Sequence, residues 1–163
     1  MRRERAVGRE EAEDLGEGLK EYKRPALTVD GVVPIDDKIV LVRRGRAPFK
    51  GELALPGGFA EYDETVEDAV RREVKEETGL STRIVRLLGV YSDPGRDPRG
   101  HTVSVVFVLK AAGKDVIAGS DAAAIELVDP DRVPKLAFDH SRIVRDYLRS
   151  EAVLRSEKGK KHN

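Results

Sequence analysis

The chain has 163 residues, which allows one domain with a hydrophobic core and little more. Its 30 basic and 30 acidic residues cancel, so no overall field attracts it to nucleic acid or to an anionic membrane, and we expect neither as a partner. It has no cysteine, which excludes disulfides, thiolate zinc sites and a cysteine nucleophile. A metal ion here would have oxygen or histidine ligands.

The sequence also indicates the compartment and the source of the protein. The N-terminus is charged, and the longest apolar run, residues 103–109, is too short to cross a bilayer, so we expect a cytoplasmic protein. Charged residues make up 37% of the chain, glutamine is absent and asparagine occurs once. This usage is typical of proteins from hot environments and indicates a thermophilic source.

The first part of the chain predicts an extension followed by strands. Residues 1–23 are dense in charge and predict an N-terminal extension outside the folded domain. Two β-branched stretches, 26–33 and 38–44, flank a turn-like PIDD segment and predict a strand hairpin. A short strand is expected at 53–55, just before a double glycine.

A helix comes next, and its limits are marked at both ends. Thr65 with Asp68 three residues on matches a capping box, and Gly79 is a residue that commonly ends helices. Later apolar stretches predict three more strands and a final helix that Asp139 can cap. We expect those strands at 83–92, 102–110 and 125–129.

This element order implies a mixed α/β (α+β) domain with helices packed against a mixed sheet. Most consecutive strands lack a helix between them, which argues against a doubly wound nucleotide-binding fold. We place the domain at residues 24–150 and regard residues 151–163 as a solvated basic tail.

The helix after the double glycine turns acidic residues toward its buried side. With about 100° between successive residues, its apolar positions define an arc centred near Val70, and Glu73, Glu76 and Glu77 fall within that arc or at its border. An ionised carboxylate is costly to bury without a partner, and three close together also repel each other. A cation is therefore expected among them.

Magnesium suits this cluster best, with manganese as a substitute, because hard divalent ions prefer oxygen ligands. The alternative is that Arg71 and Arg72 neutralise the acids across the helix surface.

The same stretch resembles the Nudix box, whose pattern is G-x5-E-x7-R-E-U-x-E-E-x-G-U with U a bulky aliphatic residue. Every specified position is filled, by Gly58, Glu64, Arg72, Glu73, Val74, Glu76, Glu77, Gly79 and Leu80. So many required residue types are not expected to match by chance.

The resemblance implies a Nudix fold, with a mixed sheet between helices, and magnesium-dependent hydrolysis of a nucleoside diphosphate linked to another group. Position by position, it implies metal ligation by Glu73, Glu76, Glu77 and the carbonyl of Gly57, with Glu73 and Glu77 catalytic. It makes Arg72, paired with Glu64, a brace for the catalytic loop, and it gives Gly58 and Gly79 structural roles.

The loop after the box carries a second group of candidates. The sequence SDPGRDPRGH of this loop, together with LAFDH at 136–140, resembles the ADP-ribose pyrophosphatase branch of the family. Arg96, Arg99 and His101 can form a cationic lip for phosphate or ribose hydroxyls. Arg44 belongs to a second cationic stretch, 43–50, which a solvated strand end would also explain. Alternatively the loop is a structural turn in which nearby aspartates pair with the two arginines.

A general base is expected outside the box, since a carboxylate bound to metal has lost basicity. In the branch that the chain resembles, this base tends to come from a loop between later strands. Here that loop is AGSDAAAIE, which offers Asp121, with Glu126 in the following strand as the alternative. We favour Asp121, although an ordinary turn aspartate would look the same.

Three functions follow from these expectations. The first is hydrolysis of ADP-ribose to AMP and ribose 5-phosphate. The second is another Nudix specificity, such as a sugar nucleotide, NADH, a dinucleoside polyphosphate or an oxidised dNTP. The third is a non-catalytic domain that senses nucleotide, which an intact box disfavours. In each case the ligand is a small nucleoside diphosphate, and the resemblance implies a possible homodimer.

Overall fold

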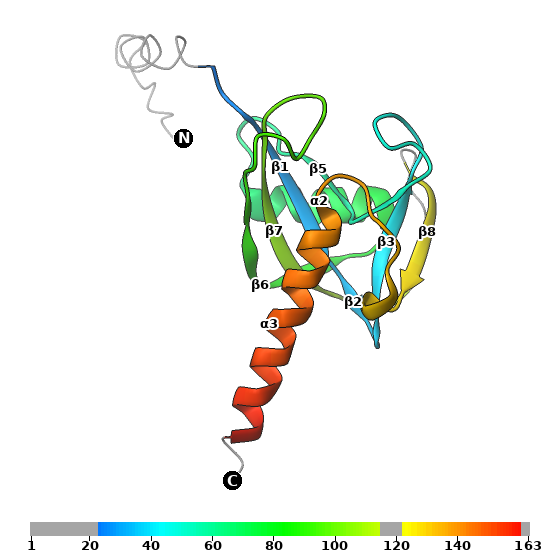
Figure 1. Ribbon diagram of the computed structural model, residues 1–163, viewed down its shortest axis with the longest axis vertical. Coiled ribbons are helices and arrows are strands. Elements are labelled where there is room, and N and C mark those ends of the chain that lie inside the picture. Colours follow the sequence, from blue (N-terminus) through cyan, green and yellow to red (C-terminus); the bar gives the residue numbers. More distant parts are fainter. Residues whose placement is uncertain (1–22, 115–121, 161–163) are drawn as a thin grey trace, which may run out of the picture.

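The computed structural model describes residues 23–114 and 122–160 (Figure 1). The predicted extension at 1–23 therefore lies almost wholly outside the described residues, as does Asp121. The strands are β1 (Ala26–Val32), β2 (Pro34–Ile35), β3 (Lys38–Arg44), β4 (Leu53–Ala54), β5 (Gly57–Phe59), β6 (Thr82–Tyr91), β7 (Thr102–Ala111) and β8 (Ala122–Val128). The helices are α2 (Val66–Thr78), the short 3-10 helix η1 (Pro130–Arg132) and α3 (His140–Lys160).

The strands form two sheets. The first has the order β5-β1-β7-β6 and is mixed, because β1 runs parallel to β7 while the other neighbours are antiparallel. In the second, β3 pairs with β2, β4 and β8, all antiparallel. The expected class, a mixed α/β fold with helices packed against the sheet, is confirmed.

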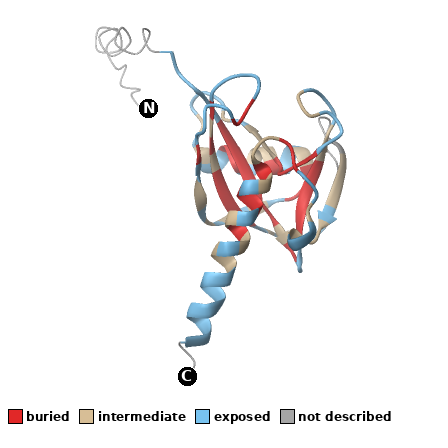
Figure 2. Cartoon of the chain, in the orientation of Figure 1, coloured by how far each residue is buried: buried red, intermediate tan, exposed pale blue. Residues whose placement is uncertain are grey.

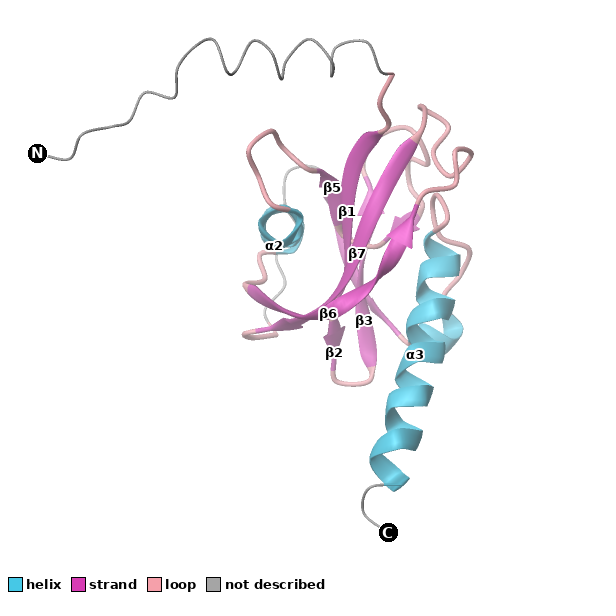
Figure 3. Cartoon of the chain, turned by 90° about the vertical axis from the view of Figure 1, so that its left-hand side faces the viewer, coloured by secondary structure: helices cyan, strands magenta, loops and turns pink. Residues whose placement is uncertain are grey.

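The mixed sheet lies between the two long helices (Figure 3). Alternating residues of β7 show this, since Val106 and Val108 belong to the core cluster that contains α3, whereas Phe107 and Leu109 belong to the cluster that contains α2. Both faces of the sheet are thus covered by a helix.

Strand pairing differs from the sequence prediction at the N-terminus. The predicted hairpin of 26–33 with 38–44 is wrong for β1, whose partners are β5 and β7. Only the short β2 pairs with the start of β3, because the chain crosses from one sheet to the other between β1 and β2. The glycine-rich β5 was not expected as a strand.

The predicted limits of α2 are confirmed. The Thr65 hydroxyl accepts a hydrogen bond from the Asp68 amide at 3.1 Å, and Gly79 ends the helix with φ at 75°. A left-handed residue at this position is usually glycine, because a side chain would be strained there.

The final helix differs from the prediction at both ends. Asp139 directly precedes α3, but its carboxylate binds Arg96, so its side chain does not serve as the expected cap. The helix also continues to Lys160, so the expected tail is helical across most of its length, although residues 152–160 are exposed (Figure 2). Within residues 23–114 and 122–160, no helix is long and apolar enough to cross a membrane.

Candidate active site

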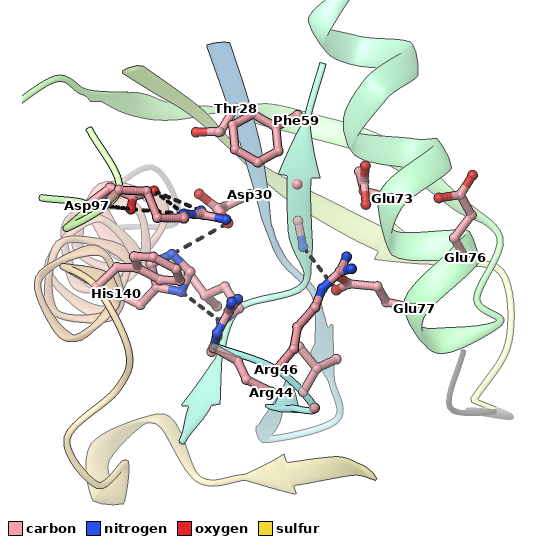
Figure 4. Close-up of a pocket in the computed structure, with 18 of the residues that line it drawn as sticks. Thr28, Asp30, Arg44, Arg46, Phe59, Glu73, Glu76, Glu77, Asp97 and His140 are labelled. Carbon is pink, nitrogen blue, oxygen red and sulfur yellow. Dashed lines mark hydrogen bonds and ion pairs between the residues drawn. The ribbon is translucent and has the colours of Figure 1, made fainter. Parts of the chain in front are cut away.

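A pocket of about 350 Å³ is lined by residues from β1, β3, β5, α2, α3 and the loop between β6 and β7 (Figure 4). Its charged lining contains both signs. The acids are Asp30, Glu61, Glu73, Glu76, Glu77 and Asp97, and the arginines are Arg43, Arg44, Arg46, Arg72, Arg96 and Arg99. Such a lining can bind a phosphate compound together with a cation.

Helix α2 supplies the acidic side of the pocket. Its buried stripe, which includes Val70 and Val74, packs against β1 and β7, and this fixes the rotation of the helix. The glutamates then lie along the edge that faces β5. The Glu73 side chain is 15% exposed and that of Glu76 is 59% exposed, so Glu76 sits at the rim.

Arg72 holds the acidic edge in place. Its guanidinium binds both oxygens of Glu64 at 2.7 and 3.0 Å, Glu73 at 2.8 Å and Glu76 at 3.3 Å, and it donates to the carbonyl of Phe59 at 3.1 Å. Its hydrogen bonds lower the pKa of Glu64 to about 2. Arg72 therefore links the loop before α2 to the glutamates, which is the geometry expected of a brace.

The expectation that two arginines neutralise the acids holds only for Arg72. Arg71 points elsewhere and pairs with Asp68. Glu77 has a different environment, because its carboxylate accepts a hydrogen bond from the Gly57 amide at 3.2 Å. Burial raises the pKa of Glu77 to about 8, and burial also raises that of Glu73.

The donor set fits a hard divalent cation. Among the residues that the structure describes, no three acidic or imidazole side chains converge into a finished metal centre. Glu73, Glu76 and Glu77 nevertheless share one helix edge, and burial raises the pKa of Glu73 and Glu77, so a cation beside them would stabilise their charged forms. A Cβ on Gly58 would come within 2.6 Å of the Glu73 carboxylate, so a glycine leaves the space that this group needs.

The opposite side of the pocket carries a cationic and aromatic group. Arg99 binds Asp97 through its Nε at 3.0 Å and its Nη2 at 2.8 Å, and its guanidinium lies 5.1 Å from the ring centre of Phe59 and 5.5 Å from that of Phe138. Arg44 lies over the same Phe138 ring at 4.8 Å. Arg44 and Arg99 are thus placed to meet an anionic ligand.

Arg96 lines the pocket but is engaged elsewhere. Its side chain is 4% exposed, and it binds both oxygens of Asp139 at 3.0 and 2.7 Å and the hydroxyl of Thr102 at 2.9 Å. A buried bidentate pair of this kind holds the loop to the start of α3. The alternative of a structural turn, with nearby aspartates paired to the two arginines, is confirmed for Arg99, which binds Asp97. It is wrong for Arg96, whose partner is the distant Asp139.

A buried polar group lies beside Arg96 and was not found from the sequence. Asp30 accepts a hydrogen bond from the Ser104 hydroxyl, and its Oδ1 lies 3.5 Å from Nε2 of His140. Nδ1 of His140 accepts from the Leu55 amide at 3.0 Å, and burial lowers the pKa of this imidazole. These contacts join β1, β7 and α3 in the wall of the pocket.

The remaining predicted site residues are not all brought to the pocket. His101 is exposed, and its Nε2 lies 3.1 Å from the carbonyl of Ser92, away from the pocket lining. Its geometry gives no support to a role in substrate binding. Asp121 lies outside the described residues, and the alternative base Glu126 is paired with Arg43.

Together, the acid-edged helix beside a glycine-rich strand and the mixed sheet between two helices define a Nudix-type hydrolase domain. The NUDIX domain model matches residues 25–147, and the chain belongs to this family.

Sequence and structure comparisons find similar proteins of the same class. The ADP-ribose pyrophosphatase of Methanocaldococcus jannaschii is 54% identical over 134 residues, covering 80% of this chain and 79% of that protein. The NUDIX domain of Shewanella oneidensis NrtR, solved as a cocrystal with ADP ribose, has a TM-score of 0.76 at 30% identity, with 86% of this chain and 97% of that chain covered. A bifunctional NMN adenylyltransferase/ADP ribose pyrophosphatase of Francisella tularensis, complexed with AMP and a manganese ion, has a TM-score of 0.69 at 28% identity. That match covers 80% of this chain and 43% of the Francisella chain.

Proposed function

We propose that the protein hydrolyses the pyrophosphate bond of ADP-ribose, adding one water and releasing AMP and ribose 5-phosphate. The observation that carries this proposal is that the box glutamates and the arginines Arg44 and Arg99 face one pocket. The name of the Methanocaldococcus relative and the ADP ribose bound by the Shewanella domain support the choice of substrate.

We propose that Mg²⁺, or Mn²⁺ in its place, is held by Glu73, Glu76, Glu77 and the carbonyl of Gly57. The donor set supports a hard ion, and a manganese ion accompanies AMP in the Francisella enzyme. When bound, such an ion neutralises diphosphate charge and makes water more acidic. Because Arg72 binds Glu73 and Glu76 in this structure, its guanidinium has to shift or share these carboxylates when a metal is present.

In this proposal the side chains of the pocket orient the substrate and supply charge. Arg44 and Arg99 can bind the diphosphate opposite the glutamates, which fixes the orientation of the bond to be broken. Arg72 fixes the position of α2 relative to the preceding loop by binding Glu64. Asp121 is our proposed general base, and Asp121→Asn should lower kcat by about a hundredfold with metal affinity unchanged. Near-normal turnover would return this role to Glu73.

The test of the proposed function is a substrate panel with identification of the products. ADP-ribose, NADH, GDP-mannose, diadenosine polyphosphates and 8-oxo-dGTP would be compared in the presence of Mg²⁺, with chelator as the control. We expect the highest kcat/KM for ADP-ribose, with AMP and ribose 5-phosphate as products. A low rank for ADP-ribose would move the assignment to another Nudix specificity, and binding without turnover would indicate a sensor.

We further propose a cytoplasmic, heat-stable enzyme, on the basis of its composition. A thermal unfolding midpoint above about 80 °C would agree with this, since domains from moderate temperatures cluster at roughly 45–65 °C. A midpoint within that lower range would contradict it.

A further inference from the structure

Phe59 is an unusual residue to find at the wall of a charged pocket. It ends β5 directly after the double glycine, lines the pocket and is 46% exposed. Figure 4 shows it beside Thr28, separated from the three glutamates by the β5 backbone. An aromatic ring that remains accessible inside a pocket has area to offer a ligand.

A cation lies over one face of the ring. The Arg99 guanidinium stacks on it at 5.1 Å, and Arg99 itself is held by Asp97, whose side chain is 2% exposed. Phe138 contacts the same guanidinium and is in turn packed edge-on against Phe49 at 4.9 Å. The orientation of the Phe59 ring is therefore set before any ligand binds, which lowers the entropy cost of stacking on it.

The backbone of Phe59 ties the ring to the acidic edge. Its carbonyl accepts from Arg72 at 3.1 Å, and its neighbour across the ladder is Thr28 of β1. The ring and the glutamates are thus parts of one rigid unit, so a ligand with a diphosphate at the glutamates can present a second group to the ring.

We propose that Phe59, held by Arg99 over one face of its ring, is the platform on which the base of the nucleotide stacks. This inference rests on the proposed function for the identity of the nucleotide. Planar bases stack favourably on aromatic rings and on guanidinium planes, whereas ribose 5-phosphate has no such surface. The ring therefore selects nucleoside diphosphates over diphosphates that lack a base.

The test measures binding of AMP and of ribose 5-phosphate by calorimetry in chelator, where no hydrolysis can occur. Phe59→Leu removes the π face but keeps an apolar side chain, and Phe59→Tyr keeps the face. Tyr62→Leu is the matched control, because Tyr62 lies three residues on, is 95% exposed and does not line the pocket. Circular dichroism would establish that each variant is folded.

We expect Phe59→Leu to weaken AMP binding by about tenfold, as is typical for loss of a stacking ring. Phe59→Tyr and Tyr62→Leu should bind AMP as the wild type does, and ribose 5-phosphate should bind all four proteins equally. Unchanged AMP affinity in Phe59→Leu, or an equal loss for ribose 5-phosphate, would overturn the proposal. If AMP binding depends on Phe59 but ADP-ribose is not hydrolysed, the proposed function fails and the stacking role stands.

Discussion

The two partly buried glutamates of α2, Glu73 and Glu77, lie one turn apart, yet their surroundings differ. Glu73 shares Arg72 with other acids, whereas the carboxylate of Glu77 accepts a hydrogen bond from the backbone amide of Gly57. Contacts within the protein hold both side chains in place. Each carboxylate can therefore meet a bound ligand without losing further conformational freedom.

Replacing either glutamate by glutamine should abolish most activity and preserve the fold. Glu73→Gln and Glu77→Gln remove a negative charge while retaining shape, and we expect kcat to fall by at least about a hundredfold. Glu67→Gln is the control, because Glu67 belongs to the same helix but is exposed and outside the box. A comparable loss of kcat in the control would mean that the helix edge is not the site.

The raised pKa of Glu77 makes stability depend on pH when metal is absent. The folded protein holds this proton until about pH 8, whereas the unfolded chain releases it near 4.5. Stability should therefore fall as pH rises from 4.5 to 8 and stay reduced above it.

Glu77→Gln lacks this penalty, so in chelator it should unfold at least about 5 °C above the wild type at pH 9, and at a similar temperature at pH 4.5. Added Mg²⁺ at pH 9 should raise the midpoint of the wild type more than that of the variant. Calorimetric scans at the two pH values provide the measurement, and a difference that is independent of pH would exclude burial as the cause.

At the scale of elements, helix α2 depends on its terminal glycine. Gly79 has φ at 75°, a conformation that costs an L-residue about 1 kcal/mol or more. Gly79→Ala should lower the free energy of unfolding by about that amount in urea titration. Gly113→Ala, in a segment with open space around the glycine and no positive φ, should have little effect and serves as the control.

Elements with local signals were predictable from the sequence. Thr65 and Gly79 mark the ends of α2 through contacts within a few residues, and the glutamates follow from helical period. The pairing of β1 with β7 was not predictable in this way, because it joins strands far apart in the chain. The hairpin prediction failed for the same reason, since a turn signal shows where a chain reverses and not which strand it then pairs with.

Some residues of the site could likewise be predicted from local sequence, and others could not. Box residues could be identified because their spacing is local, and a lone acid in the apolar run of β1 was the one available sign of Asp30. Its partners Ser104 and His140 come from β7 and α3, so the group forms only once the fold brings them together. Likewise, Arg96 could not be told from Arg99 until burial separated them.

At the scale of the whole molecule, α3 extends beyond the body that it helps to form (Figure 1). Tyr147 is 7% exposed and packs in the core, and Glu151 still binds Arg86 at 2.8 Å. From residue 152 to residue 160 the helix is exposed. The helix is therefore anchored to the body at least as far as Glu151, one residue past the predicted boundary.

Deleting residues 152–163 should leave the free energy of unfolding unchanged within about 0.5 kcal/mol, because an exposed segment buries no core and short helices are marginal on their own. Activity on ADP-ribose should also be retained, since the pocket lies at the opposite end of α3, around His140. Deletion from residue 147 onward is the contrasting variant and should destabilise the domain severely through loss of Tyr147. If the shorter deletion costs several kcal/mol and makes a dimer dissociate in sedimentation, the exposed apolar residues Val153 and Leu154 serve a homodimer interface instead.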